Sequence, residues 1–352
     1  MTFCGDELEP GSRGFYRMKV ATMLDGSDLT IPLHVVRGEG KGPTLGIMAG
    51  VHGTEYYQNR IIRRIVNETT PDEVAGTILA VPVANPLAFS HVSRQSPRPP
   101  EETVDFANLN RVFPGRRETP LFGSMVATDV SLTMKMAAVL SDEVIGRCDY
   151  LLDFHGQMPG MALKKMLYNA HEDSGELARV FGLGIIHDPV GGSSSSRGAL
   201  SGSTGYAEKL GIPGVTPEVG GGGHGEGFEA ECERLGVQGV RNVMAHIGLV
   251  EGEAVLPERQ FYFRRAPHVR ATCGGYLVSY MEAGDVGIGR PTREVKEGEV
   301  LARVYSPYTL EEVEELRAPV DGLLYACRVS GLVEAQSEVL AVADFEDSKW
   351  IE

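Results

Sequence analysis

The sequence predicts an α/β fold, a mixed sheet flanked by helices, over residues 1–250, followed by a C-terminal all-β barrel or sandwich domain over residues 251–352. Short apolar runs alternate with helical patterns from about Pro43 to Val250, which is typical of a sheet covered by helices. After Glu251 the chain changes to shorter, glycine-punctuated runs of strand-like composition. A chain of 352 residues is also longer than one hydrophobic core usually serves, so we expect two domains.

The spacing of apolar residues predicts the elements of the first domain. Continuous apolar runs predict buried strands at residues 44–51, 77–84, 150–154 and 214–219. Apolar residues at helical spacing predict helices at residues 57–66, 125–145 and 228–250. The residues before Pro43 are expected to add an N-terminal strand segment.

The second domain contains two similar β-turn-β units, at residues 296–305 and 318–343, which predict a small barrel or sandwich. It resembles the biotinyl/lipoyl-type barrel, in which a lysine at an exposed hairpin tip carries the prosthetic group. No lysine is expected at such a tip here. Lys135, in the single Met-Lys-Met tripeptide, falls within a helical pattern, where a solvated helix residue is the simpler interpretation. The domain is therefore expected to lack the modified lysine.

Charge and composition exclude several classes of function. The formal net charge of -15 would repel a phosphate backbone, so nucleic acid is not an expected partner. The same charge is compatible with a cationic substrate. The chain starts without the basic and apolar segments of a secretory signal, and no apolar stretch is long enough to cross a bilayer, so we expect a cytoplasmic protein without a membrane partner. Five scattered cysteines are expected to stay reduced there.

The strongest single motif is His52-Gly53-Thr54-Glu55, directly after the apolar run at residues 44–51. Both charged side chains emerge where a buried strand ends, which is where open α/β sheets build their sites. A His and a Glu three residues apart can converge on one ion, and an imidazole nitrogen with a carboxylate oxygen suits Zn²⁺. Taken alone the pair is a weak signal, because the same spacing is common on helix surfaces.

His155 strengthens the metal hypothesis, because it follows another buried run in Asp153-Phe154-His155-Gly156. Two His and one Glu leave a fourth position open for water, as catalytic zinc sites require. Strand alternation points the Asp153 and His155 side chains the same way. Asp153 is therefore a candidate to accept a hydrogen bond from a ligand histidine, although it could equally pair with a nearby base.

Glu218 is the candidate proton shuttle. An apolar run leads into it and four glycines follow it, so the backbone can approach a substrate closely. A partly desolvated glutamate beside such a site can accept a proton from water and hand it to a leaving amine. Without the other motifs, a glutamate that ends a strand is more often a helix cap or a solvated residue.

Arginine and asparagine supply a candidate anion site in Asn108-Leu109-Asn110-Arg111, with Arg94 upstream. The guanidinium of Arg111 offers a planar fork for a carboxylate, and Asn110 adds an uncharged donor. Surface arginines are commoner than such clamps, so this element gains weight only in combination with the others.

Together, these motifs resemble the succinylglutamate desuccinylase/aspartoacylase family, which is related to the zinc carboxypeptidases. The shared set, in order, is HGTE (52–55), NPLAF (85–89), Arg94, NLNRVFPG (108–115), DFHG (153–156) and PEVGGGG (217–223). The resemblance covers residues 43–250 and extends to the β domain, which that family also has at its C-terminus. It implies a zinc-carboxypeptidase-like sheet in the first domain.

The resemblance also implies a role for each matching residue. It makes His52, Glu55 and His155 the ligands of one zinc ion per chain and Glu218 the general base and acid. A separate group acts on the substrate: Arg94 would polarise the scissile carbonyl, while Asn110 and Arg111 would hold the substrate carboxylate.

The departures from the family pattern fall on the substrate side. Aspartoacylase-like enzymes have a further arginine ten residues before the catalytic glutamate, where this chain has Glu208. Arg197 is a candidate replacement, and His224 is a candidate pocket residue. Some bacterial relatives deacylate N-acetylated diamino acids, which agrees with the acidic charge balance of this chain.

Three functions remain open from the sequence. The leading hypothesis is a zinc-dependent amidohydrolase that cleaves an N-acyl amino acid or N-acyl diamino acid to a carboxylate and a free amine. The same residues would serve a metallocarboxypeptidase that acts on short peptides. A third hypothesis is a non-catalytic module that binds a metal or an acid, which would not need Glu218 or Arg94. The sequence leaves homo-oligomer formation open.

Overall fold

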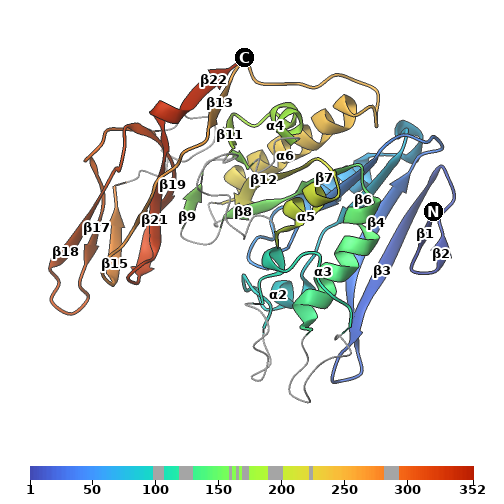
Figure 1. Ribbon diagram of the computed structural model, residues 1–352, viewed down its shortest axis with the longest axis horizontal. Coiled ribbons are helices and arrows are strands. Elements are labelled where there is room, and N and C mark those ends of the chain that lie inside the picture. Colours follow the sequence, from blue (N-terminus) through green and yellow to red (C-terminus); the bar gives the residue numbers. More distant parts are fainter. Residues whose placement is uncertain are drawn as a thin grey trace.

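The computed structural model describes residues 1–97, 107–118, 130–157, 161–163, 166–168, 174–188, 201–221, 225–280 and 293–352. Arg197 and His224 lie outside the described residues. A large sheet with helices occupies one side of the molecule, and antiparallel strands from the C-terminal part of the chain occupy the other (Figure 1). The predicted fold class, a mixed α/β sheet with a C-terminal all-β part, is confirmed.

The large sheet has 11 strands in the order β22-β13-β11-β10-β12-β7-β5-β6-β4-β3, with β8 paired to β12. Their bounds are β3 Ser12–Thr22, β4 Asp28–Arg37, β5 Thr44–Met48, β6 Thr77–Val81, β7 Tyr150–Asp153, β8 His155–Gln157, β10 Met166–Tyr168, β11 Ile185–His187, β12 Gly214–Gly221, β13 Gln260–Phe263 and β22 Ser348–Ile351. The central strands β5, β6, β7 and β12 are parallel, and β3, β4 and β22 pair antiparallel at the two edges. The four strands predicted from apolar runs are β5, β6, β7 and β12.

The helices are α1 Asn59–Glu68, α2 Pro86–Ser90, α3 Leu132–Glu143, α4 Gly175–Phe181, α5 Ser203–Lys209 and α6 Glu226–His246, with short 3-10 turns η1 Pro71–Glu73, η2 Leu109–Arg111, η3 Ile145–Arg147 and η6 Phe345–Asp347. The sequence predicted α1, α3 and α6 from their periodicity. Local signals set where two of them begin. Ser131 caps α3 by accepting a hydrogen bond from the Met134 N–H, and Glu226 places negative charge in the first turn of α6.

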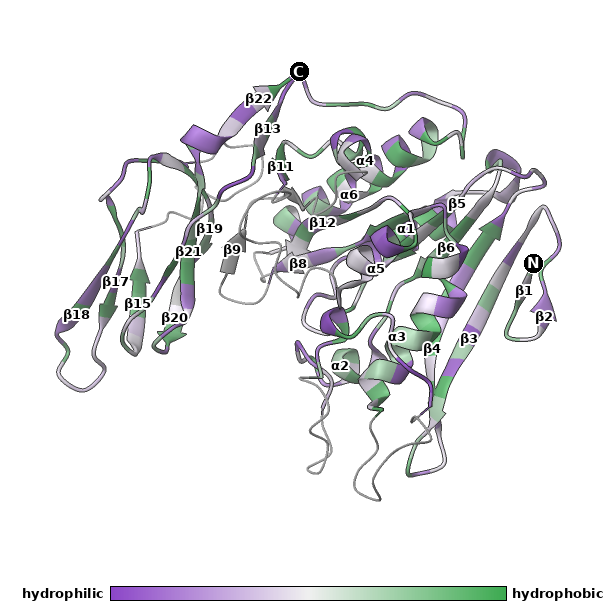
Figure 2. Ribbon diagram, viewed as in Figure 1, coloured by the Kyte–Doolittle hydropathy of each residue, from purple (hydrophilic) through white to green (hydrophobic). Residues whose placement is uncertain are grey.

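The sheet buries both of its faces, because successive side chains of a strand point to opposite sides. Ile47 of β5 packs into one core with α1, α4 and α6, whereas its neighbour Met48 packs into a second core with α3. Leu152 and Leu151 of β7 divide between the same two cores. The long edge strand β3 instead alternates hydrophilic and hydrophobic residues, because only one of its faces is covered (Figure 2).

The C-terminal part forms two smaller antiparallel sheets around their own core. One has the order β14-β21-β19-β16, with β9 added to β19, and the other has the order β18-β17-β15-β20. Their bounds are β9 Met161–Leu163, β14 His268–Arg270, β15 Gly275–Ser279, β16 Arg293–Val295, β17 Val300–Tyr305, β18 Glu312–Arg317, β19 Gly322–Arg328, β20 Ser330–Val333 and β21 Glu338–Asp344. At the other end of the chain, β1 Thr2–Phe3 and β2 Asp6–Glu7 form a small hairpin.

Two strands connect the parts in a way that the sequence did not indicate. After the small sheets, the chain returns to the large sheet, where β22 pairs with β13. In the opposite direction, β9, which follows β8 of the large sheet along the chain, pairs with β19 of a smaller sheet. The division into domains at residue 250 stays a prediction. Among the residues that the structure describes, no helix combines the length and apolar character needed to cross a bilayer.

Candidate metal centre

Three potential metal ligands meet at the carboxyl ends of neighbouring parallel strands. Met48, the last residue of β5, lies opposite Asp153, the last residue of β7. The segment after β5 provides His52 and Glu55, and β8, which follows β7, begins with His155. Residues 100 or more positions apart therefore come together because parallel strands end at the same edge of a sheet.

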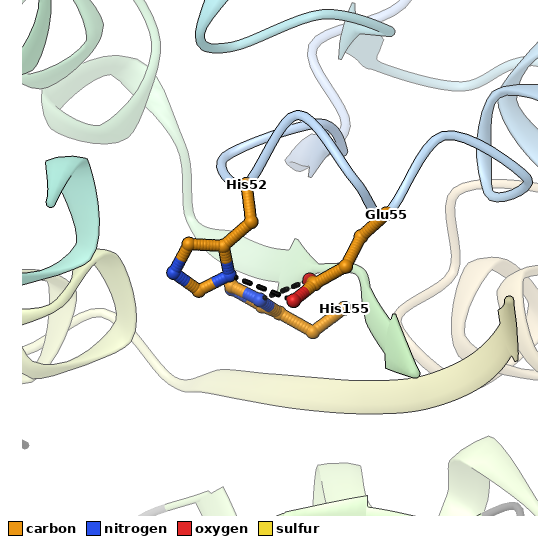
Figure 3. A group of neighbouring side chains, drawn as sticks. All are labelled: His52, Glu55 and His155. Atoms are coloured by element: carbon orange, nitrogen blue, oxygen red, sulfur yellow. Dashed lines mark hydrogen bonds and ion pairs between the residues drawn. The ribbon is translucent and has the colours of Figure 1, made fainter. Parts of the chain in front are cut away.

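The three side chains face one another in a buried cluster (Figure 3). One potential ligand atom from each residue lies within 4.8 Å of those of the other two. Glu55 stands between the rings: its Oε1 lies 2.9 Å from Nδ1 of His52, and its Oε2 lies 2.9 Å from Nδ1 of His155. All three residues are at most 4% exposed, so water screens these charges little.

The geometry around His52 fits a metal ligand better than an ordinary hydrogen bond. Its Nδ1 is buried and has no hydrogen-bond partner among the described residues, although the Glu55 carboxylate is close by. Two atoms that approach without hydrogen-bond geometry can both direct lone pairs at a third centre. Two imidazole nitrogens and a carboxylate oxygen are the donor set that Zn²⁺ takes in catalytic sites, so these residues fit the implied metal.

The outer nitrogen of each ring has a partner that fixes the tautomer. His155 directs Nε2 at Oδ2 of Asp153, 3.2 Å away, and His52 directs Nε2 at Oδ1 of Asn108, also 3.2 Å away. Because each oxygen accepts the Nε2–H proton, both rings present Nδ1 to the centre. Asp153 thus lies beside His155, and its role as the partner of a ligand histidine stays a prediction. Asn108 was not singled out, although it stands two residues before Asn110 in the same motif.

Burial and charge act together on the protonation of the cluster. Burial alone would lower the pKa of the His155 imidazolium, but the Asp153 and Glu55 carboxylates outweigh it and raise that pKa well above its ordinary value. Burial alone would raise the pKa of Glu55, and the two histidines instead hold it well below the usual range. For His52 burial prevails and lowers the pKa. Metal binding must therefore displace a proton from His155.

Glu218 lies on β12 directly opposite His155 in the strand register. Its side chain is half-buried. Burial raises the pKa of its carboxyl group to about 7; nearby Glu55 and Asp153 add to this, and His155 and Arg94 oppose it. A carboxyl group with a pKa near neutrality can both accept and return a proton, which is the property of a general base and acid.

Arg94 reaches the same centre from the loop after α2, and its Nη1 donates to Oε1 of Glu55 at 2.6 Å. Asn85 explains how that loop is held. Its side chain caps α2 by accepting from the Ala88 N–H, and it also accepts a hydrogen bond from Ser96 Oγ, two residues beyond Arg94. Asn85 of the NPLAF motif therefore helps to hold the loop that carries Arg94.

Asn110 lies beside His155, whereas Arg111 points to the surface. Oδ1 of Asn110 accepts from the Ser203 N–H at 3.1 Å, and its Nδ2 lies 3.5 Å from Nε2 of His155. Ser203 Oγ in turn donates to Asp153, so Ser203 connects Asn110 to the carboxylate that accepts from His155. Arg111 is exposed and donates to the backbone oxygen of Asn110. Of the two residues of the predicted carboxylate clamp, Asn110 thus lies at the centre and Arg111 at the surface. The role of the pair stays a prediction.

Known proteins share both the sequence pattern and the fold. A profile of the succinylglutamate desuccinylase/aspartoacylase catalytic domain matches residues 41–247. The N-alpha-acetyl-L-2,4-diaminobutyric acid deacetylase of Halomonas elongata is 28% identical over 354 residues, which cover 97% of this chain and 94% of that protein.

Solved structures show the same architecture. The product-bound ectoine utilization protein EutE (DoeB) of Ruegeria pomeroyi is 24% identical with a TM-score of 0.76, and the match covers 96% of both chains. The succinylglutamate desuccinylase/aspartoacylase of Rhodobacter sphaeroides is 24% identical with a TM-score of 0.75, over 96% of this chain and 97% of the other. At 24% identity, these two solved structures show that the fold is shared and nothing beyond the fold.

Proposed function

The chain belongs to the succinylglutamate desuccinylase/aspartoacylase family and is a hydrolase of N-acyl amino acids, and from that premise we propose that it deacetylates an N-acetylated diamino acid with one zinc ion per chain. The observation that supports this most is the buried cluster of His52, Glu55 and His155 with Glu218 in register opposite His155. A metal-binding module would not need a half-buried carboxyl group with a pKa near 7 at that place.

The proposed reaction is hydrolysis of the amide bond by water. Zn²⁺ held by His52, Glu55 and His155 would supply Lewis-acid charge that makes a water more acidic at neutral pH. Glu218, as the carboxylate, takes a proton from the attacking water. The same residue, now a carboxylic acid, then gives that proton to the nitrogen of the leaving amine, so the products are a carboxylate and a free amine.

Arg94 is proposed to stabilise the negative charge that develops on the carbonyl oxygen. Its guanidinium already lies at the centre through the hydrogen bond to Glu55. Arginine has five N–H donors, so Nη1 can stay on Glu55 while another N–H turns to the substrate oxygen. Asp153 is proposed as the partner that orients His155 for the metal, because its carboxylate accepts the Nε2–H.

The substrate class follows from the chemistry of a diamino acid. Such a molecule, acetylated on its α-amine, presents an α-carboxylate and a free side-chain ammonium. Asn110 and Arg111 are proposed to hold the carboxylate. A second cationic residue, where aspartoacylase-like enzymes have an arginine, would repel the ammonium, and this chain has Glu208 on α5 instead. The relative from Halomonas elongata is named for a substrate of this class.

A substrate panel with purified, zinc-loaded protein tests the proposal. The panel contains N-acetylated diamino acids with the free amine at different chain positions, N-acetylaspartate, N-succinyl amino acids and short peptides, and the readout is released primary amine. We expect the highest kcat/KM for an N-acetylated diamino acid and about one zinc per chain by elemental analysis. Turnover of peptides alone would support the carboxypeptidase alternative, and tight binding without any product would support the non-catalytic module.

A further inference from the structure

The side-chain amide of Gln58 lies between strand β8, which carries His155, and strand β12, which carries Glu218. The residue lies three positions after Glu55, just before α1, and it is fully buried. Its Nε2 lies 3.1 Å from the backbone oxygen of His155 and 2.6 Å from that of Val219. Because both partners are carbonyl oxygens, the amide must present its NH₂ group and donate one hydrogen to each.

The two carbonyl groups lie at an irregularity in the pairing of β8 with β12. Glu218 of β12 pairs with His155 of β8, and the next pair is Gly221 with Gln157. Between these pairs, two residues of β12 lie opposite Gly156 alone. An extra residue of this kind is a β-bulge, which interrupts the backbone hydrogen bonds of the ladder and bends the strand. Gln58 supplies donors at the point where the ladder is interrupted.

The side-chain amide of Gln58 also explains why residue 156 is a glycine. A Cβ atom added to Gly156 would lie 2.0 Å from Nε2 of Gln58 and 2.5 Å from the backbone oxygen of Gly220. No side chain fits there unless Gln58 or the bulge moves. The glycine of the DFHG motif therefore makes room for the link between β8 and β12.

We infer that Gln58 is a positioning residue that sets the distance between Glu218 and the metal ligand His155. This inference rests on the proposed function, in which Glu218 is the general base. One NH₂ group connects the segment that carries Glu55, the backbone of His155 and the residue next to Glu218. A shift of about 1 Å in a catalytic group can reduce the rate by about 100-fold, so loss of this link is expected to act on catalysis and not only on stability.

The test uses Gln58→Met, which keeps the length of the side chain and removes both donors. At saturating zinc we expect kcat to fall by about 30- to 100-fold, because Glu218 is no longer held at its distance from the reacting water. KM should change by less than about threefold, because no group that binds substrate is removed. The dissociation constant for Zn²⁺, measured by competition with a chromophoric chelator, should rise by about tenfold because His155 is less well held.

Gln260→Met is the matched control. Gln260 lies on β13, is also buried, and donates from Nε2 to two backbone oxygens, those of Arg179 at 3.1 Å and Leu183 at 2.8 Å. This variant loses the same kind and number of hydrogen bonds away from the metal centre. We expect its melting temperature to fall as in Gln58→Met, while kcat and the zinc affinity stay at the wild-type values.

Wild-type kcat in Gln58→Met at full zinc occupancy would overturn the inference, as would an equal loss of kcat in Gln260→Met. The zinc-affinity measurement needs no substrate, so unchanged affinity in Gln58→Met overturns the inference even if the wild type cleaves no N-acyl amino acid. That inactivity of the wild type would by itself refute the proposed function.

If Gln58→Met does not fold, Gln58→Glu replaces it. A carboxyl group buried against two carbonyl oxygens stays protonated and keeps one donor, so kcat should fall by less than in the complete loss of donors, to about one-tenth of the wild-type value. Wild-type kcat in this variant would contradict the inference in the same way.

Discussion

Replacing Asp153 by Asn removes one buried negative charge from the candidate metal centre and keeps the shape of the side chain. The carboxylate accepts from Nε2 of His155 at 3.2 Å and from Oγ of Ser203, and it is fully buried. Both hydrogen bonds reach the same oxygen, Oδ2, and an Asn oxygen can accept both, so the main change is the loss of the negative charge. Loss of a partner of this kind typically weakens metal binding by about 10- to 100-fold, or about 1.4 to 2.7 kcal/mol. Because no water screens Asp153, we expect the upper half of that range.

The assay is the dissociation constant for Zn²⁺, determined by chelator competition at constant pH. Asp344→Asn serves as the control, because Asp344 is 2% exposed, pairs with Arg265 and accepts the Glu346 N–H at 2.9 Å in the C-terminal part of the chain. Its replacement should lower the melting temperature and leave zinc affinity unchanged. Zinc affinity within twofold of wild type in Asp153→Asn, or the same loss in both variants, would refute the reasoning.

Four further predictions concern the reaction and the packing around it. Glu218→Gln should retain zinc by elemental analysis and lose about 10²- to 10⁴-fold in kcat, and a loss below tenfold would contradict its role as the base. Since burial raises the pKa of Glu218 to about 7 and a bound dication lowers it, kcat should fall as the pH drops through about 7 or below; a profile that is flat from mildly acidic to neutral pH would argue against this carboxyl group. Arg94→Ala should reduce kcat by about 10²- to 10³-fold, whereas Arg117→Ala, at an exposed ion pair, should leave it unchanged. Gly156→Ala should lower the free energy of unfolding in urea by about 1 to 3 kcal/mol, because the new Cβ would overlap Gln58; unchanged stability would show that the site can relax.

The sequence predicted the features that depend on residues close together in the chain. Continuous apolar runs located β5, β6, β7 and β12, because a strand buried on both faces needs an apolar residue at nearly every position. The motifs after β5 and β7 located His52, Glu55 and His155, because the ends of parallel strands lie at one edge of the sheet. The sequence also singled out Arg94 and Asn110, whose roles came from the family resemblance, and the structure places both beside this cluster.

The tertiary structure decided the features that depend on which distant segments pair. Asn108 contacts His52 across 56 positions, and Gln58 donates to backbone groups of residues near positions 155 and 219. Neither contact leaves a periodic pattern, because a single side chain that donates to backbone carbonyls imposes no spacing on the residues that it joins. The return of β22 to the large sheet also depends on tertiary structure. The position of this edge strand of four residues is decided by the strand that pairs with its backbone, which is β13. The chemistry of this chain is therefore visible in its motifs, and the distances that the chemistry requires arise only when the strands pair.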